Sequence, residues 1–326
     1  MKLERVYRER CAARGLDAAA IESSVRAVAA LERDAGDAGF ELADAPISFV
    51  ERYMAGLVEN GEANEAVVVS IARYFVVARA DAVAIRLLAY LLPVGVLPAM
   101  ATRLGELEGI ATRDAVLGHV QIPPEGSPPE SYPAATKDFV EALVYEIGED
   151  RARQVLAWHV HGIAPESFAS ERERYLELGS VDAWLEEWHA RQVETLRRHA
   201  DDGTLWFEQR ITHAVVDFVQ RNPEIQGGVR VGDTIYVTKI PYDPDRYLMA
   251  TDPLEKRRLA CHCPLAVSAI TESGSGVPSL WCSCSAGYTK FPFDIVLGQA
   301  TEATVLKSVL AGDELCRFAI RLPPPA

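Results

Sequence analysis

The stretch GVRVGDTIYVTKIPY, residues 228–242, decides the fold class because its apolar residues alternate with polar ones. Alternation with a period of two is typical of half-buried β-strands, and the Gly232–Asp233 pair between the two runs is a turn signal. We therefore expect two antiparallel strands here. The closing stretch DELCRFAIRLP, residues 313–323, alternates in the same way and predicts a further strand of the same sheet.

The chain before this stretch has helical periodicity instead. Apolar residues recur at helical spacing after Asp17, which can accept a hydrogen bond as an N-cap. Further helices are expected over 46–58, over 65–92 as one bent or two separate helices, and in three amphipathic segments over 136–159, 180–199 and 205–222. The predicted fold class is α+β: a mostly helical N-terminal two-thirds, then a small C-terminal α/β domain with an antiparallel sheet and a Cys-rich metal site.

A proline-rich stretch suggests where the chain divides. QIPPEGSPPESYP, residues 121–133, holds five prolines and one glycine, a composition typical of linkers. We expect a helical domain over 1–120, a linker over 121–135, a helical segment over 136–225 that packs on the last domain, and the Cys-rich domain over 226–326. Within that last domain VPSLWCSC, residues 277–284, is expected to form a strand.

The charge balance excludes some classes of function. The chain has 33 basic and 47 acidic residues, and residues 226–326 hold 10 of each, so the excess acidity lies before residue 226. An acidic surface repels phosphate backbones, which argues against nucleic acid as a partner. No apolar run reaches the roughly 18 residues needed to span a bilayer, and no signal peptide is evident, so a cytoplasmic protein without membrane contact is expected.

Five of the six cysteines fall within residues 261–316, and four of them form two Cys-x-Cys pairs. The pairs are Cys261 with Cys263, which enclose His262, and Cys282 with Cys284. Thiols of a cytosolic protein are kept reduced, which favours metal binding or catalysis over disulfides. Two such pairs can supply a tetrahedral zinc site. The candidate metal ligands are Cys261, His262, Cys263, Cys282, Cys284 and Cys316.

Other interpretations stay open at this point. The thiols can be inert small hydrophobes of a core, because cysteine is among the most buried residue types. They can also act directly in redox chemistry, or hold an iron–sulfur cluster in place of zinc.

The end of the chain resembles a known domain. Cys284–Tyr288, Gly298, Ser308–Asp313 and Cys316–Phe318 are similar to the end of the 4-vinyl reductase domain and of the family named L-2-amino-thiazoline-4-carboxylic acid hydrolase. The resemblance covers about the last hundred residues. It implies an α/β ligand-binding fold, zinc-bearing in the sensor members, with Cys284 and Cys316 as ligands. The Cys261-His262-Cys263 pair departs from the sensor pattern.

These features lead to two expected functions. The first is a zinc-dependent hydrolase that cleaves a C–N or C–S bond of a small organic molecule, since a metal with an open position activates water. Tyr288, Lys239 and Lys290 are the candidate catalytic residues, and Tyr242 and Asp294 are further polar groups nearby in sequence. The second is a non-enzymatic sensor in which four thiolates close a structural zinc site. The expected partner is a small-molecule ligand or substrate, and a homodimer is left open.

Overall fold

The computed structural model describes residues 1–160, 162–272 and 274–323. The chain divides into two compact units. Unit 1 comprises Met1–Gly95 and Ile122–Tyr132, and unit 2 comprises Val96–Gln121 and Pro133–Ala326. Each unit has its own buried core, so each is described by itself.

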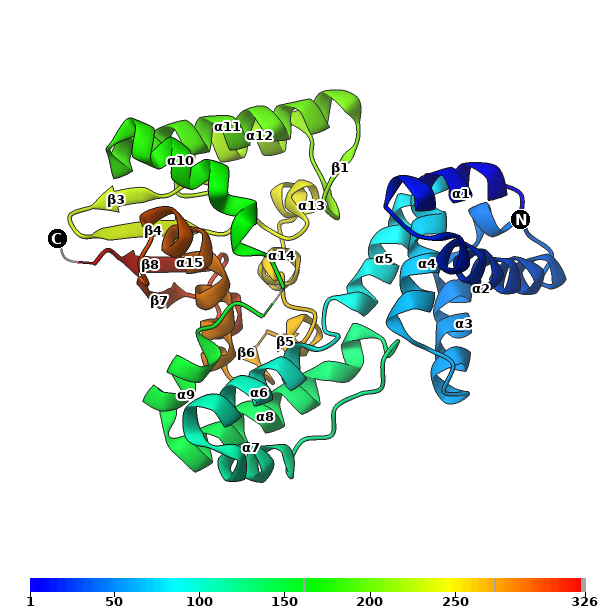
Figure 1. Cartoon of the computed structure of the whole chain (residues 1–326), viewed down its shortest axis with the longest axis horizontal. Helices are drawn as coiled ribbons and strands as arrows, with labels where there is room; N and C mark the ends of the chain where they lie inside the picture. Colours follow the sequence, from blue (N-terminus) through cyan, green and yellow to red (C-terminus); the bar gives the residue numbers. More distant parts are fainter. Residues whose placement is uncertain (161, 273, 324–326) are drawn as a thin grey trace. The chain divides into compact units, whose positions relative to one another are not determined.

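Unit 1 is helical (Figure 1). Its helices are α1 (Glu4–Ala13), α2 (Ala18–Asp37), α3 (Ile47–Glu59), α4 (Glu65–Val77) and α5 (Asp81–Leu91). The predicted N-cap is confirmed, because the Asp17 carboxylate accepts a hydrogen bond from the backbone N–H of Ala20 at 2.8 Å. The stretch 65–92 forms two helices, which separate at Arg79, a residue with a left-handed φ of 57°.

Segment 122–132 belongs to unit 1, although the residues directly before it in sequence belong to unit 2, and it is held there by polar contacts. The Glu125 carboxylate accepts from the backbone N–H of Glu65 at 3.3 Å. Arg86 donates to Glu130 at 2.8 Å and to Glu51 at 2.7 Å. These contacts attach the proline-rich stretch to the helices of its own unit.

The stretch Asp81–Glu108 is long and apolar enough to cross a membrane by length and composition alone. The core helices of soluble proteins pass the same test, and 44% of its most apolar window is buried inside the structure. It is therefore weak evidence for a membrane span.

Unit 2 contains the remaining helices and the strands. Its main helices are α6 (Val96–Glu108), α7 (Ile110–Leu117), α8 (Tyr132–Ile147), α9 (Glu149–Leu156), α10 (Ala169–Leu178), α11 (Val181–Asp202), α12 (His213–Gln220), α13 (Pro244–Met249), α14 (Pro253–Ala260) and α15 (Ser283–Leu297). The sequence predicts one continuous helix over 136–159, whereas the structure has two. Gly148, with a left-handed φ of 74°, lies between the end of α8 and the start of α9.

The prediction of a helix over 205–222 is partly wrong. Residues 205–210 form a short hairpin of β1 (Leu205–Trp206) and β2 (Gln209–Arg210), and only His213–Gln220 is helical. Phe207 in the turn adopts a φ of 52°, which few non-glycine residues do. The Gln209 side chain donates to the carbonyls of Pro241 and Tyr242 at 2.8 and 2.9 Å, so a tertiary clamp overrides the local helical pattern.

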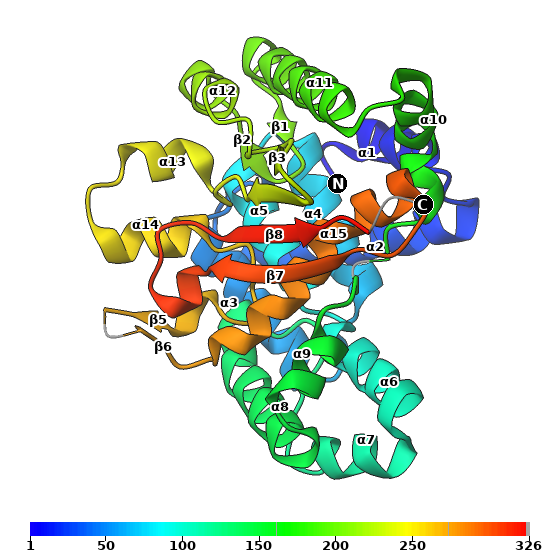
Figure 2. The same ribbon diagram turned by 90° about the vertical axis from the view of Figure 1, so that its left-hand side faces the viewer.

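The predicted antiparallel sheet is confirmed. Its strands are β3 (Val229–Val231), β4 (Thr234–Thr238), β7 (Glu302–Lys307) and β8 (Arg317–Arg321), in the order β3-β4-β8-β7. Ile235 pairs with Ile320, and Val237 pairs with Phe318. Figure 2 shows β7 and β8 side by side with α15 behind them. A second, two-stranded pairing joins β5 (Ile270–Thr271) to β6 (Gly274–Ser275). At the level of class, the α+β prediction is therefore confirmed.

The alternation in β4 and β8 places their apolar side chains on one face. Ile235 and Ile320 pack there with Phe293 of α15 and Trp184 of α11. The expectation of a strand over 277–284 is wrong, because Ser279–Cys282 forms the 3-10 turn η5 and α15 begins at Ser283. The side chains of Trp281 and Ala286 in this segment are buried, with exposures of 2% and 1%.

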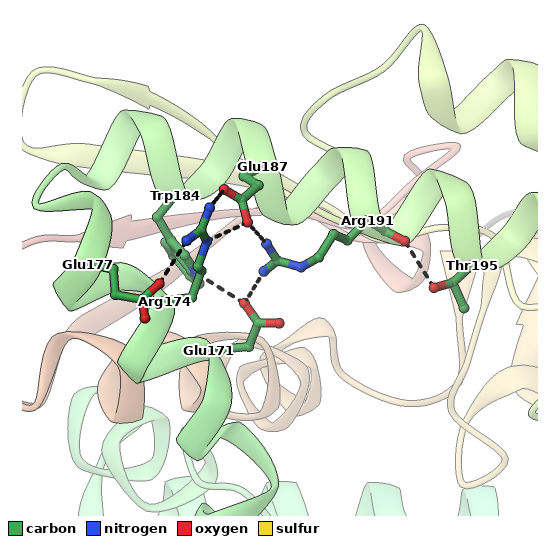
Figure 3. A network of polar contacts seen from close by, with 7 residues as sticks. All are labelled: Glu171, Arg174, Glu177, Trp184, Glu187, Arg191 and Thr195. Carbon is green, nitrogen blue, oxygen red and sulfur yellow. Dashed lines mark hydrogen bonds and ion pairs between the residues drawn. The ribbon is translucent and has the colours of Figure 1, made fainter.

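A network of ion pairs joins α10 to α11 (Figure 3). Arg174 donates to Glu187 at 2.7 Å, Arg191 pairs with both Glu187 and Glu171, and the Trp184 indole donates to Glu171 at 3.2 Å. The hydrogen bond from Arg174 holds the pKa of Glu187 below its usual range. Trp184 also contacts Phe293 at a ring separation of 5.8 Å, so the network fixes the side chain against which α15 packs.

Candidate functional site

The five C-terminal cysteines come from four separate elements of unit 2. Cys261 and Cys263 follow α14, Cys282 ends η5, Cys284 lies in the first turn of α15, and Cys316 precedes β8. Four are buried, with exposures between 5% and 9%, and Cys263 is partly buried. These thiols lie up to 55 residues apart in sequence and belong to the end of α14, the start of α15 and the segment before β8.

Burial raises the pKa of every one of these thiols. It raises the pKa of Cys284 to about 12, with a further rise from the neighbouring Cys263. Burial also raises the pKa of Cys261, Cys263, Cys282 and Cys316. The charges of neighbouring thiols add to this rise for Cys261, Cys263, Cys282 and Cys284.

The prediction of a formed metal centre is not supported. Across the three described ranges, no group of three or more His, Cys, Asp and Glu side chains converges as metal ligands. Three sulfurs have other hydrogen-bond partners among the described residues: the Trp281 indole donates to Cys263 at 3.2 Å, Cys282 bonds the Ser308 hydroxyl at 2.9 Å, and Cys261 donates to the Cys263 carbonyl at 4.0 Å. Protonated thiols attract one another weakly, so hydrogen bonds to other groups set their directions.

The donors nevertheless suit a soft ion in kind. His262 Nε2 lies 2.6 Å from the carbonyl oxygen of Ile240 and donates to it, which leaves Nδ1 with its lone pair. Burial, with the charge of Lys239, lowers the pKa of His262 to about 3, so the imidazole is neutral. An imidazole that donates one ring N–H to a backbone carbonyl is the usual arrangement behind a metal-ligating histidine.

Lys239 follows β4, and its charge acts on His262 and on three of the thiols. Its backbone N–H donates to the Cys316 carbonyl at 3.0 Å, and its Nζ donates to the Ser285 hydroxyl at 3.0 Å. Nζ also lies 5.2 Å from the centre of the Tyr288 ring. Among the described residues no carboxylate forms an ion pair with Lys239. Two predicted catalytic residues, Lys239 and Tyr288, are thus brought together beside the thiols.

Lys290, the third predicted catalytic residue, is engaged elsewhere. It forms an ion pair with Asp294, one turn further along α15. Asp294 also accepts from the backbone N–H and the hydroxyl of Thr301, each at 2.7 Å. These bonds connect the end of α15 to the start of β7, which is a structural arrangement.

Glu208 is a polar residue at the site that the sequence analysis did not identify, and it acts on two tyrosines that the analysis did name. Burial raises the pKa of Glu208, in the β1–β2 turn, and burial with the charge of Glu208 raises the pKa of Tyr242 and of Tyr288. The Tyr242 hydroxyl is buried with no hydrogen-bond partner among the described residues. Its ring contacts His262 edge-on at 5.5 Å.

Gly287, in the Cys284–Tyr288 stretch, has a packing role. A Cβ at this position would overlap the backbone of Ala157 and Trp158. The segment after α9 therefore lies directly on α15, one turn from Cys284. His159 in that segment stacks on Phe291 with ring centres 3.8 Å apart.

Comparison with known proteins gave no relatives: no family model, curated protein or solved structure matches this chain.

Proposed function

We propose that the C-terminal part of unit 2 binds zinc through its thiols and hydrolyses a C–N or C–S bond of a small organic molecule. A bound zinc ion would supply an activated water and polarise the bond to be cleaved. Five thiols and a neutral imidazole fit this ion in donor type and number. An iron–sulfur cluster uses the same ligands and is the less favoured occupant.

The observation that carries the proposal is the uncompensated polarity beside the thiols. Lys239 has only a hydroxyl and an aromatic ring as side-chain partners, and the Tyr242 hydroxyl has no partner among the described residues. Buried polar groups without partners are costly, and they concentrate at sites that bind or react. A zinc ion that only stabilises the fold does not require such groups, which favours hydrolysis over a purely structural role.

The second candidate is a small-molecule sensor with a closed zinc site. The burial of four of the cysteines favours it. Cys261, Cys282, Cys284 and Cys316 are each at most 9% exposed, which suits a site sealed from substrate. Chelation separates the two functions. Removal of a structural ion should unfold the C-terminal part of unit 2, whereas removal of a catalytic ion should leave a folded but inactive protein.

The test begins with purified, reduced protein. Elemental analysis and X-ray absorption give the identity of the ion and the number of sulfur ligands, and hydrolysis of 2-aminothiazoline-4-carboxylate, the substrate that the resemblance implies, is followed by release of thiol. Cys284→Ser should lower metal content and turnover, while Cys11→Ser, a buried cysteine of unit 1, should change neither. Protein that binds no metal and keeps full turnover after Cys282→Ser and Cys284→Ser would refute the proposal.

A further inference from the structure

The hairpin of β1 and β2 concentrates several unfavourable features in one short element. Phe207, in its turn, has a left-handed φ of 52°, which an aromatic residue rarely adopts, and its side chain is 77% exposed. The next residue, Glu208, is partly buried, and burial raises the pKa of its carboxyl. The turn therefore exposes an aromatic ring and covers a carboxylate, which is the reverse of the usual preference.

The residues around Glu208 do not compensate its charge. Among the described residues no cation forms an ion pair with Glu208. The charge of Glu208 instead acts on Tyr242 and Tyr288. The Tyr242 hydroxyl is itself buried with no hydrogen-bond partner among the described residues. The closed hairpin thus leaves a carboxylate without a cation and a hydroxyl without a hydrogen bond, and both groups are more stable where water reaches them.

Few contacts hold the hairpin in place. Its ladder consists of two residue pairs, and isolated two-stranded hairpins are marginally stable in water. The Gln209 side chain, 4% exposed, donates to the carbonyls of Pro241 and Tyr242 at 2.8 and 2.9 Å. The partly buried Trp206 packs against buried residues of α11 and α12. The two hydrogen bonds from Gln209 are therefore a principal part of what keeps the hairpin closed.

These two hydrogen bonds place the hairpin against residues 240–242, which also contact the candidate site. The Ile240 carbonyl lies 2.6 Å from His262 Nε2, and the Tyr242 ring contacts the His262 ring edge-on at 5.5 Å. The preceding residue, Cys261, is 5% exposed. A molecule from solution thus reaches Cys261 only if some part of the protein moves.

We propose that the β1–β2 hairpin is a lid over the His262 side of the candidate site, and that it opens when the Gln209 side chain releases the carbonyls of Pro241 and Tyr242. Opening relieves the backbone strain at Phe207, hydrates Glu208 and Tyr242, and gives small molecules access to Cys261. Elements of low local stability are the ones that move in this way. The lid serves the hydrolase and the sensor alike, because both need a ligand to reach buried groups, and it requires neither a bound metal nor turnover.

Hydrogen exchange of the reduced full-length protein measures the opening directly. Backbone amides of residues 205–210 should exchange faster than those of α11. Gln209→Leu keeps the approximate size of the side chain but loses its hydrogen bonds, so exchange of the hairpin should become about five- to thirtyfold faster. Phe207→Asn should slow it about two- to fivefold, because asparagine tolerates the left-handed conformation. Gln154→Leu, at an exposed position of α9, is the matched control and should exchange as the parent protein does.

Labelling with iodoacetamide, measured for each cysteine by mass spectrometry, tests whether the hairpin covers the site. Gln209→Leu should speed the labelling of Cys261 and Phe207→Asn should slow it, in the same ratios as the hydrogen exchange. Cys11, 0% exposed in unit 1, should react at an unchanged rate in every variant.

Two results overturn the proposal. One is exchange of the hairpin in the parent protein as slow as that of α11. The other is a pair of variants that change hairpin exchange in the expected directions but leave the labelling rate of Cys261 unchanged. If Gln209→Leu also accelerates exchange in α11, it has destabilised the whole unit, and Phe207→Asn then decides alone because it stabilises the closed hairpin.

Discussion

The side-chain amine of Lys239 lies 3.0 Å from the hydroxyl oxygen of Ser285, in the first turn of α15. The same lysine's backbone N–H bonds the Cys316 carbonyl. One residue thus connects the end of β4 to the helix that carries Cys284 and to the segment that carries Cys316. Its positive charge acts against the burial that raises the pKa of Cys263, Cys284 and Cys316.

Lys239→Met should make the thiols less reactive. Without the ammonium charge the pKa of the neighbouring thiols rises further, and each unit of rise lowers the thiolate fraction about tenfold. We expect reaction with an aromatic disulfide at pH 8 to slow by about three- to tenfold. Lys290→Met is the matched control, because its lysine pairs with Asp294 and should leave the rate unchanged. Equal slowing by both variants would show that the charge of Lys239 has no special effect on the thiols.

The buried thiols predict a loss of stability at alkaline pH in protein stripped of metal. An unfolded thiol ionises near pH 9.0, whereas burial raises the pKa of Cys284 to about 12 in the folded chain. Between these values the unfolded state binds fewer protons, so the free energy of unfolding falls as pH rises, by about 1.4 kcal/mol per pH unit for one thiol. The stabilising contribution is fully present below pH 9.0 and is lost as pH rises towards 12.

Urea unfolding at pH 8, 9 and 10 measures this slope. Cys284→Ser removes one ionising group and should make the dependence shallower, with a serine hydroxyl of similar size in its place. A parent protein whose stability does not change over this range, or a variant with the same slope, would contradict the assigned cause.

The elements that local patterns specify were predictable from the sequence. The Asp17 N-cap, the β3–β4 hairpin and the terminal strand with Phe318 and Ile320 each depend on residues within a few positions of one another. Their apolar spacing and turn residues act locally, so a single sequence contains the required information.

The elements that distant contacts specify were not predictable. The β1–β2 hairpin depends on a clamp from Gln209 to Pro241 and Tyr242, more than thirty residues away. The segment at Cys282 is helical although its apolar residues fit a strand, since Trp281 and Phe139 pack edge-on at 6.4 Å. At the site, the cysteine spacing predicts a shared ligand set, and among the described residues no such group of metal ligands converges. The spacing contains nothing about Glu208, Ser285 or the hydrogen bonds that the sulfurs form.

Glu208→Gln should stabilise the protein at neutral pH. Burial raises the pKa of Glu208 above its ordinary 4.5, so its share of stability is present below pH 4.5 and is lost as pH rises through the raised value. The neutral amide of glutamine has no buried charge to desolvate. We therefore expect the free energy of unfolding to rise by about 1 kcal/mol or less at pH 7, and this difference should disappear at pH 4. Thermal unfolding at the two pH values measures the difference. A variant less stable than the parent at pH 7 would show that the carboxylate has a stabilising partner.

Gly287→Ala should destabilise unit 2, because the new methyl group would overlap the backbone of Ala157 and Trp158. Backbone atoms in a packed contact cannot rotate aside as a side chain does, and overpacking of this kind costs about 1–3 kcal/mol. Gly56→Ala is the matched control: it also lies within a helix, α3, and a Cβ there meets nothing within 4 Å. That variant should gain about 0.5–1 kcal/mol from the better helix propensity of alanine. Chemical denaturation of the two variants and the parent should therefore give shifts of opposite sign. If Gly287→Ala proved as stable as Gly56→Ala, the segment after α9 would not lie against α15, and the close packing beside Cys284 would be wrong.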